Sequence, residues 1–123
     1  MDRFQAAFKI LYLISCVDGE TCGEELDIIM AYLKKNQEDI VFDHRKVMQS
    51  LLFLSREGSL NELKNSAAVF KELSNQENRL CLLDFAFNLV VADGRISADE
   101  IRMFNILGEI WEIDIDEFLK NKQ

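Results

Sequence analysis

The chain has 123 residues, with 14 lysines and arginines against 22 aspartates and glutamates, and therefore a formal net charge of −8. The length suits one domain, and 49% hydrophobic with 29% charged residues is typical of a soluble globular protein, which excludes disorder and a collagen-like structure. The excess of acid argues against a nucleic-acid partner, because affinity for phosphates comes largely from Lys and Arg. It favours a divalent cation or a basic protein partner.

The cysteines and the hydropathy pattern indicate the cellular compartment of the protein. Cys16, Cys22 and Cys81 form no CxxC pair and leave an odd thiol. Neither a signal peptide nor a run of about 18 apolar residues accompanies them. We therefore expect a reduced, cytoplasmic protein that does not span a membrane.

The sequence contains no proline, which favours long helices. Apolar residues recur at helical spacing, so we predict an all-α single domain of about seven helices. In chain order they cover residues 2–17, 23–36, 43–58, 59–73, 75–92, 97–112 and a short segment from residue 114. The first and fifth are apolar on nearly every face, and we expect both to be buried.

Cap signatures set the boundaries of these helices. Asp43 is the expected N-cap of the third helix, and Gly58 its expected end. Three further helices are expected to open with capping boxes, in which an N-cap hydroxyl and an acid three residues later satisfy each other's backbone N–H groups. The three pairs are Ser59 with Glu62, Ser74 with Glu77, and Ser97 with Glu100.

An internal repeat relates the two ends of the chain. The segment from Val17 to Leu26 aligns with the segment from Ala92 to Ile101, 75 residues later, and each follows an apolar helix. We infer an internally duplicated helical bundle with repeat halves at about residues 1–42 and 75–123 and middle helices in residues 43–74. Two buried hairpins packed on each other is the simplest architecture.

Both copies of the repeat contain Asp-Gly followed by Glu, as in the second half of a calcium loop. A true EF-hand is excluded, since hydrocarbon or thiol side chains stand where its first two carboxylates belong. An acidic pair in each copy remains available to share one cation, with Ca²⁺ or Mg²⁺ as the hard ions that suit oxygen ligands. The candidate metal ligands are Asp18 and Glu25 in the first copy, and Asp93 and Glu100 in the second.

The same residues also have a purely structural interpretation. Asp93 can form an Asx turn, and Glu100 can complete a capping box with Ser97 without any ion. In the first copy Cys22 stands in place of Ser97, so the cap is poorer there, yet the acidic pair is retained. Retention of the pair favours a function, and both interpretations stay open.

The tract from Asn88 to Ile101, followed by Ile110-Trp111-Glu112-Ile113, resembles the TerB-like domain family. The family is named after tellurite-resistance protein B and also occurs in DjlA-type membrane co-chaperones. The likeness spans most of the chain. It implies a small, internally duplicated helical protein that acts in stress responses to metals or tellurium oxyanions. By position, it also implies divalent-cation binding by Asp18, Glu25, Asp93 and Glu100.

Zinc binding and enzymatic catalysis lack the residues that they usually require. Cys16, Cys22 and His44 fit no structural-zinc spacing and lack a fourth soft ligand. With one histidine, no nucleophile elbow and no Gly-rich phosphate loop, we expect no enzyme. Two functions remain: a cation-binding stress protein, and an all-helical interaction module whose acidic face docks a partner and holds no metal.

Two expectations concern polar groups in the apolar helices. The repeat register relates Lys9 to Asp84, and two outcomes stay open: the two charges pair, because buried charges need partners, or either side chain extends to the surface. Cys16 and Cys81 are expected to pack as small hydrophobic side chains.

Overall fold

The computed structural model describes residues 2–16, 23–36, 43–91 and 96–121. These residues form seven α-helices and no strand, which confirms the predicted all-α class. The helices are α1 (Arg3–Cys16), α2 (Gly23–Asn36), α3 (His44–Leu52), α4 (Arg56–Glu72), α5 (Gln76–Val90), α6 (Ala98–Trp111) and α7 (Ile115–Asn121).

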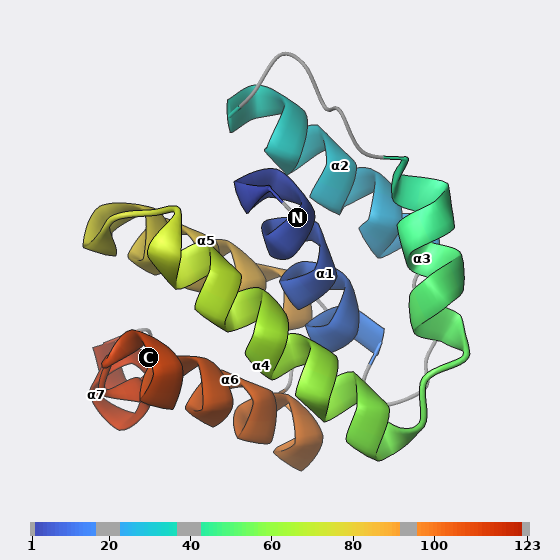
Figure 1. Cartoon of the computed structure of the whole chain (residues 1–123). Helices are drawn as coiled ribbons and strands as arrows, with labels where there is room; N and C mark the ends of the chain where they lie inside the picture. Colours follow the sequence, from blue (N-terminus) through green and yellow to red (C-terminus); the bar gives the residue numbers. More distant parts are fainter. Residues whose placement is uncertain (1, 17–22, 37–42, 92–95, 122–123) are drawn as a thin grey trace.

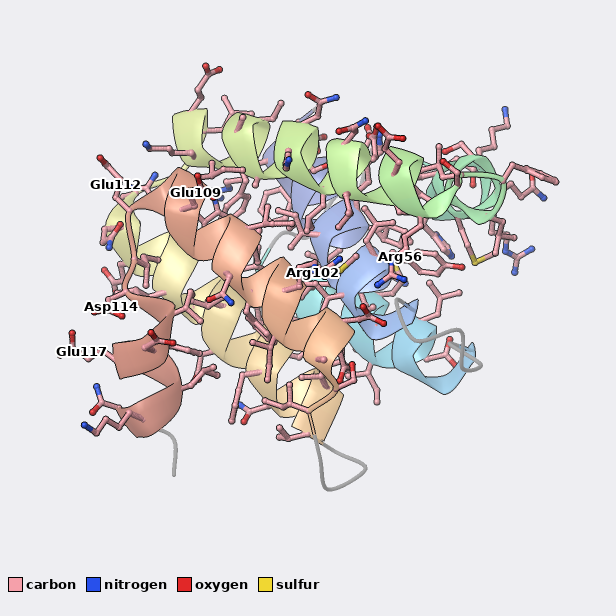
Figure 2. The ribbon with its side chains drawn as sticks, turned by 90° about the horizontal axis from the view of Figure 1, so that it is seen from below. Arg56, Arg102, Glu109, Glu112, Asp114 and Glu117 are labelled. Atoms are coloured by element: carbon pink, nitrogen blue, oxygen red, sulfur yellow. The ribbon has the colours of Figure 1, made fainter. Side chains whose placement is uncertain are left out.

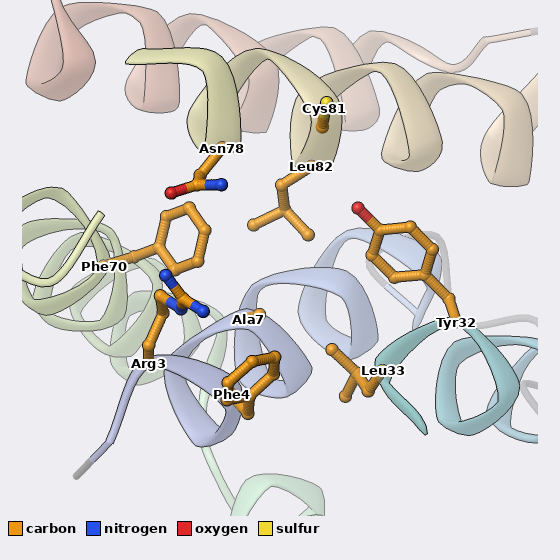
Figure 3. Close-up of a pocket in the computed structure, with 9 residues that line it drawn as sticks. All are labelled: Arg3, Phe4, Ala7, Tyr32, Leu33, Phe70, Asn78, Cys81 and Leu82. Carbon is orange, nitrogen blue, oxygen red and sulfur yellow. The ribbon is translucent and has the colours of Figure 1, made fainter. Parts of the chain in front are cut away.

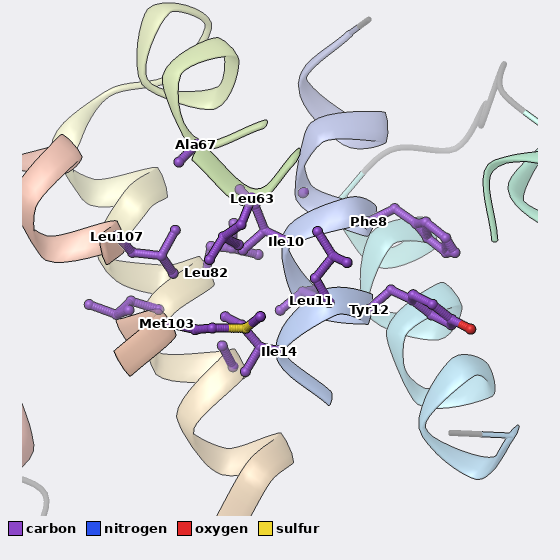
Figure 4. Close-up of a cluster of buried hydrophobic side chains, with 14 of the residues drawn as sticks. Phe8, Ile10, Leu11, Tyr12, Ile14, Leu63, Ala67, Leu82, Met103 and Leu107 are labelled. Carbon is purple, nitrogen blue, oxygen red and sulfur yellow. The ribbon is translucent and has the colours of Figure 1, made fainter. Parts of the chain in front are cut away.

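The central helix is α1, and Figure 1 shows the other helices arranged around it. A helix that is apolar all round must be covered on every side, which is why this segment lies at the centre. Figure 4 shows its side chains packed between those of α4, α5 and α6. The fully buried residues of α1 are Ala6, Phe8, Ile10, Leu11 and Ile14.

Helix α4, from the middle of the chain, connects α1 near the N-terminus to α6 near the C-terminus. Helix α4 packs along α1 on one side and along α6 on the other, and these are the two most extensive helix contacts in the described structure. Leu63 and Ala67 of α4 are fully buried there. The expected picture of two hairpins packed on each other is therefore incomplete, because α4 stands between α1 and α6.

The boundary between α3 and α4 differs from the prediction. Asp43 caps α3 as expected and accepts hydrogen bonds from the backbone N–H groups of Arg45 and Lys46. However, α3 ends at Leu52, and α4 begins four residues later with Ser55 as its N-cap. The hydroxyl of Ser55 accepts from the N–H of Gly58 at 3.0 Å. Gly58 thus lies in the first turn of α4, and the Ser59–Glu62 pair is not its cap.

Helix α5 is buried on one face only, which corrects the expectation of full burial. Leu82, Leu83, Ala86, Leu89 and Val90 face the core. Leu80 and Cys81 are exposed, so the thiol of Cys81 is not packed as a small hydrophobe. The cap also differs from the prediction, since Asn75 and Asn78 form the capping box in place of Ser74 and Glu77.

The corner between α6 and α7 is a Schellman-type turn. Glu112 adopts a left-handed conformation with φ 57°, and the N–H of Ile113 donates to the carbonyl of Gly108 at 2.9 Å. This turn brings Ile115 of α7 over Gly108, where both residues are buried. The short α7 is thereby folded back on α6.

Lys9 has a partner that the repeat did not predict. Its ammonium Nζ lies 2.6 Å from Oε1 of Glu62 on α4. The two side chains are only 13% and 24% exposed, so water screens the pair weakly. The ion pair therefore reinforces the α1–α4 contact at the centre of the fold.

Breaking the Lys9–Glu62 pair is expected to destabilise the protein. Glu62→Gln and Lys9→Met should each lower the free energy of unfolding by about 1–2 kcal/mol, because each leaves a poorly solvated group without its charged partner. The double variant should cost less than the sum of the two, and urea denaturation measures all three. The exposed pair Arg56–Asp99 provides the control, since Asp99→Asn should change stability by less than about 0.5 kcal/mol. Strictly additive losses at Lys9 and Glu62 would contradict this prediction.

Candidate functional site

The candidate site is the start of α6, where the second copy of the repeat ends. Of the four predicted metal ligands, Glu100 is the one whose side chain the structure describes. Asp18 and Asp93 lie outside the described residues. Glu25 is in the first turn of α2, and its side chain also lies outside them.

Glu100 forms the capping box that the sequence predicts. Its Oε1 accepts a hydrogen bond from the backbone N–H of Ser97 at 2.8 Å. In return, the hydroxyl of Ser97 accepts from the N–H of Glu100 at 3.1 Å. Ser97 has the extended backbone of an N-cap residue, with φ −77° and ψ 162°. Two backbone donors of the first turn are satisfied in this way.

The carboxylate of Glu100 is unusually well buried for a charged group, since the residue is only 5% exposed. Acidic groups are favoured in the first turn of a helix, where unpaired N–H groups give a partial positive charge. The cap therefore accounts for part of the stabilisation that burial requires. A buried carboxylate that is held in one position is also a suitable ligand for a hard cation.

A second acidic residue at the same helix start pairs with α4. Asp99 Oδ1 accepts a hydrogen bond from the guanidinium of Arg56, the first residue of α4. The side chains are 37% and 67% exposed, so the pair contributes little stability. It connects the starts of α4 and α6, which the packing of these two helices places side by side. Sequence reasoning missed this contact, since the residues are 43 positions apart and Arg56, unlike Asp99, lies outside the repeat.

Four exposed acidic residues lie at the opposite end of α6. Figure 2 shows Glu109, Glu112, Asp114 and Glu117 where α6 passes into α7, away from Arg56 and Arg102. We call these four residues the acidic corner. Asp114 also has a structural role there, since its Oδ1 accepts from the N–H of Glu117 at 3.1 Å. The four residues are close in sequence, and they lie together where α6 passes into α7.

Two features absent from the described ranges concern metal binding and membrane insertion. No group of three or more His, Cys, Asp or Glu side chains in them is placed to hold a metal ion. No helix in this part of the chain has the length and apolar character needed to cross a membrane. The described acids therefore supply at most part of a cation's ligand set.

Comparison with known proteins gives one match. The model of the family described as tellurite resistance protein TerB matches residues 4–123, which is nearly the whole chain. No curated protein and no solved structure matches the chain.

Proposed function

Because the chain belongs to the family of tellurite resistance protein TerB, we propose that it is a non-enzymatic protein that binds a divalent cation weakly in a response to tellurite, metals or general stress. The observation that carries the proposal is the buried carboxylate of Glu100, held by Ser97 at the start of α6. The net charge of −8 adds to it, since an acidic protein attracts cations.

In this proposal, each Asp-Gly corner contributes one aspartate and one glutamate. Asp93 and Glu100 form the favoured site, in the second copy of the repeat. Asp18 and Glu25 form the equivalent site in the first copy. Two carboxylates with water and backbone carbonyls suit Ca²⁺ or Mg²⁺, which prefer oxygen ligands. So small a ligand set gives weak binding, because affinity rises with the number of charged ligands and with the rigidity of the site.

Two substitutions at Glu100 separate the effect of its negative charge on cation binding from the effect of its capping hydrogen bond on stability. Glu100→Gln keeps an oxygen that accepts from Ser97 N but removes the charge, whereas Glu100→Ala removes both. Glu100→Ala should therefore lower the free energy of unfolding by about 1 kcal/mol, and Glu100→Gln by less. Calorimetric titration of the unaltered protein with Ca²⁺, Mg²⁺ or Mn²⁺ should give a saturable heat of binding, and both variants should lose it.

Two further variants complete this experiment. Asp93→Asn should also abolish the heat, since it removes the other proposed ligand. Glu109→Gln removes one exposed acid from the same helix, so it should leave the heat unchanged. Equal binding by all variants, or no saturable heat in the unaltered protein, would overturn the cation proposal.

The acidic corner favours a second candidate function. It is an exposed group of carboxylates on a rigid helical turn, which suits the docking of a basic protein. In this case Glu100 would serve only as a cap. The same titration distinguishes the two candidates, because a docking module would give no saturable cation heat and would keep its partner binding in Glu100→Gln.

A further inference from the structure

A small cavity lies between α1, α2, α4 and α5, away from the start of α6 (Figure 3). Its volume is about 100 Å³. Phe4, Tyr32, Phe70 and Leu82 form much of its wall. Figure 3 shows Arg3, Phe70 and Asn78 on one side of it, and Tyr32 and Leu33 on the other. The cavity therefore has both apolar and polar walls, with Arg3 and Asn78 on one side and the hydroxyl of Tyr32 on the other.

The charged group at this cavity is the guanidinium of Arg3. It is the one charged side chain among the described residues that line the cavity. It lies 4.8 Å from the ring centroid of Phe4, and this cation–π contact restricts its position. No carboxylate of the described residues pairs with it, although the protein is strongly acidic. The nearest acid in sequence, Asp2, is engaged in capping α1 through the N–H of Gln5.

Asn78 adds a second donor on the same side. Its Oδ1 accepts from the backbone N–H of Asn75 at 3.2 Å as part of the capping box of α5. This bond fixes the orientation of the amide, so its NH₂ group is the part left to donate. An amide NH₂ and a guanidinium are both donors only, and together they require an acceptor.

We propose that this cavity binds a small organic carboxylate with a short apolar tail. The carboxylate would accept hydrogen bonds from Arg3 and Asn78, and the tail would lie among the aromatic and aliphatic side chains. A cavity of about 150 Å³ holds the six carbons of benzene, so this cavity of about 100 Å³ suits a tail of roughly four to five carbons. The proposal is independent of cation binding, because it involves none of the residues at the start of α6.

Titration with hexanoate tests the proposal, with amide chemical shifts and thermal stability as readouts. Hexanoate should shift the signals of residues around the cavity in a saturable way. Acetate lacks the tail and hexylamine lacks the acceptor, so both should bind at least about tenfold more weakly. Hexanoate should also slow the alkylation of Cys81, an exposed thiol that lines the cavity, as measured by peptide mass spectrometry.

Variants of the two donors sharpen the test. Arg3→Met keeps much of the apolar stem and should weaken hexanoate binding about tenfold or more, whereas Arg45→Met, at an exposed arginine of α3, should change it less than twofold. Asn78→Asp keeps the oxygen that caps α5 but places a negative charge beside the ligand, so binding should be lost while thermal stability is retained. Equal binding of hexanoate and hexylamine, or an equal effect of Arg3→Met and Arg45→Met, would overturn the proposal.

Discussion

Replacing Gly108 with alanine is expected to destabilise the protein by about 3 kcal/mol, close to the upper end for overpacked cores. A Cβ atom at this position would stand 2.3 Å from Cγ1 of Ile115 and 2.7 Å from the backbone oxygen of Ile113. Neither neighbour can yield easily, since Ile115 is buried and Ile113 belongs to the Schellman turn. The variant must therefore displace α7 from α6. Urea denaturation followed by circular dichroism measures the loss.

Gly58→Ala is the matched control for this substitution. Gly58 also lies in a helix, but its Cβ would meet the side chains of Ser55 and Leu54 at 3.3 Å and beyond. Alanine is favoured over glycine in helices by about 1 kcal/mol, so this variant should be neutral or slightly stabilised. Similar stability of the Gly108 and Gly58 variants would refute the proposed packing of α7.

The second large effect is expected at Trp111, the single tryptophan of the chain. It is 1% exposed, its Nε1 donates to the carbonyl of Ala67 at 2.9 Å, and its ring lies 5.6 Å from that of Phe70. It therefore joins α6 to α4. Trp111→Ala should cost about 3–5 kcal/mol, because it leaves a large cavity in this contact. Trp111→Phe keeps most of the ring but loses the donor, and should cost about 1–2 kcal/mol.

Phe53→Ala provides the comparison for an aromatic residue outside the core. Phe53 is 89% exposed, and its loss should change the free energy of unfolding by less than about 0.5 kcal/mol. Chemical denaturation gives all three values. In the unaltered protein, tryptophan fluorescence should shift to longer wavelength on unfolding, as Trp111 enters water. A loss at Trp111 no greater than that at Phe53 would show that the α4–α6 contact is not where the structure has it.

Local signals in the sequence predicted part of the candidate site correctly. The Ser97–Glu100 capping box depends on groups three residues apart, so its geometry follows from the start of one helix. The N-caps at Asp43 and Asp114 were predictable for the same reason. The start of α4 was not, because Ser55 and Ser59 are both acceptable N-caps and the local sequence does not choose between them.

Contacts between distant residues escaped sequence reasoning. The repeat related Lys9 to Asp84, but the carboxylate on Lys9 is that of Glu62, because α4 occupies the face of α1 where the ammonium lies. Arg56 with Asp99, and Arg3 with Asn78 around the cavity, are likewise brought together by helix packing. A single sequence contains no local signal for such pairs.

The sequence by itself determined the all-α class and the capping box at Glu100, since these depend on composition, periodicity and residues within one helical turn. The family followed from the resemblance of the tract from Asn88 to Ile101, and the family match over residues 4–123 confirms it. The tertiary structure decided that α4 joins α1 to α6, that Cys81 is exposed, and that Arg3 stands at a cavity where no carboxylate of the described residues pairs with it. The physical reason is that helix formation is governed by neighbouring residues, whereas the face that a helix buries depends on which other helices compete to cover it.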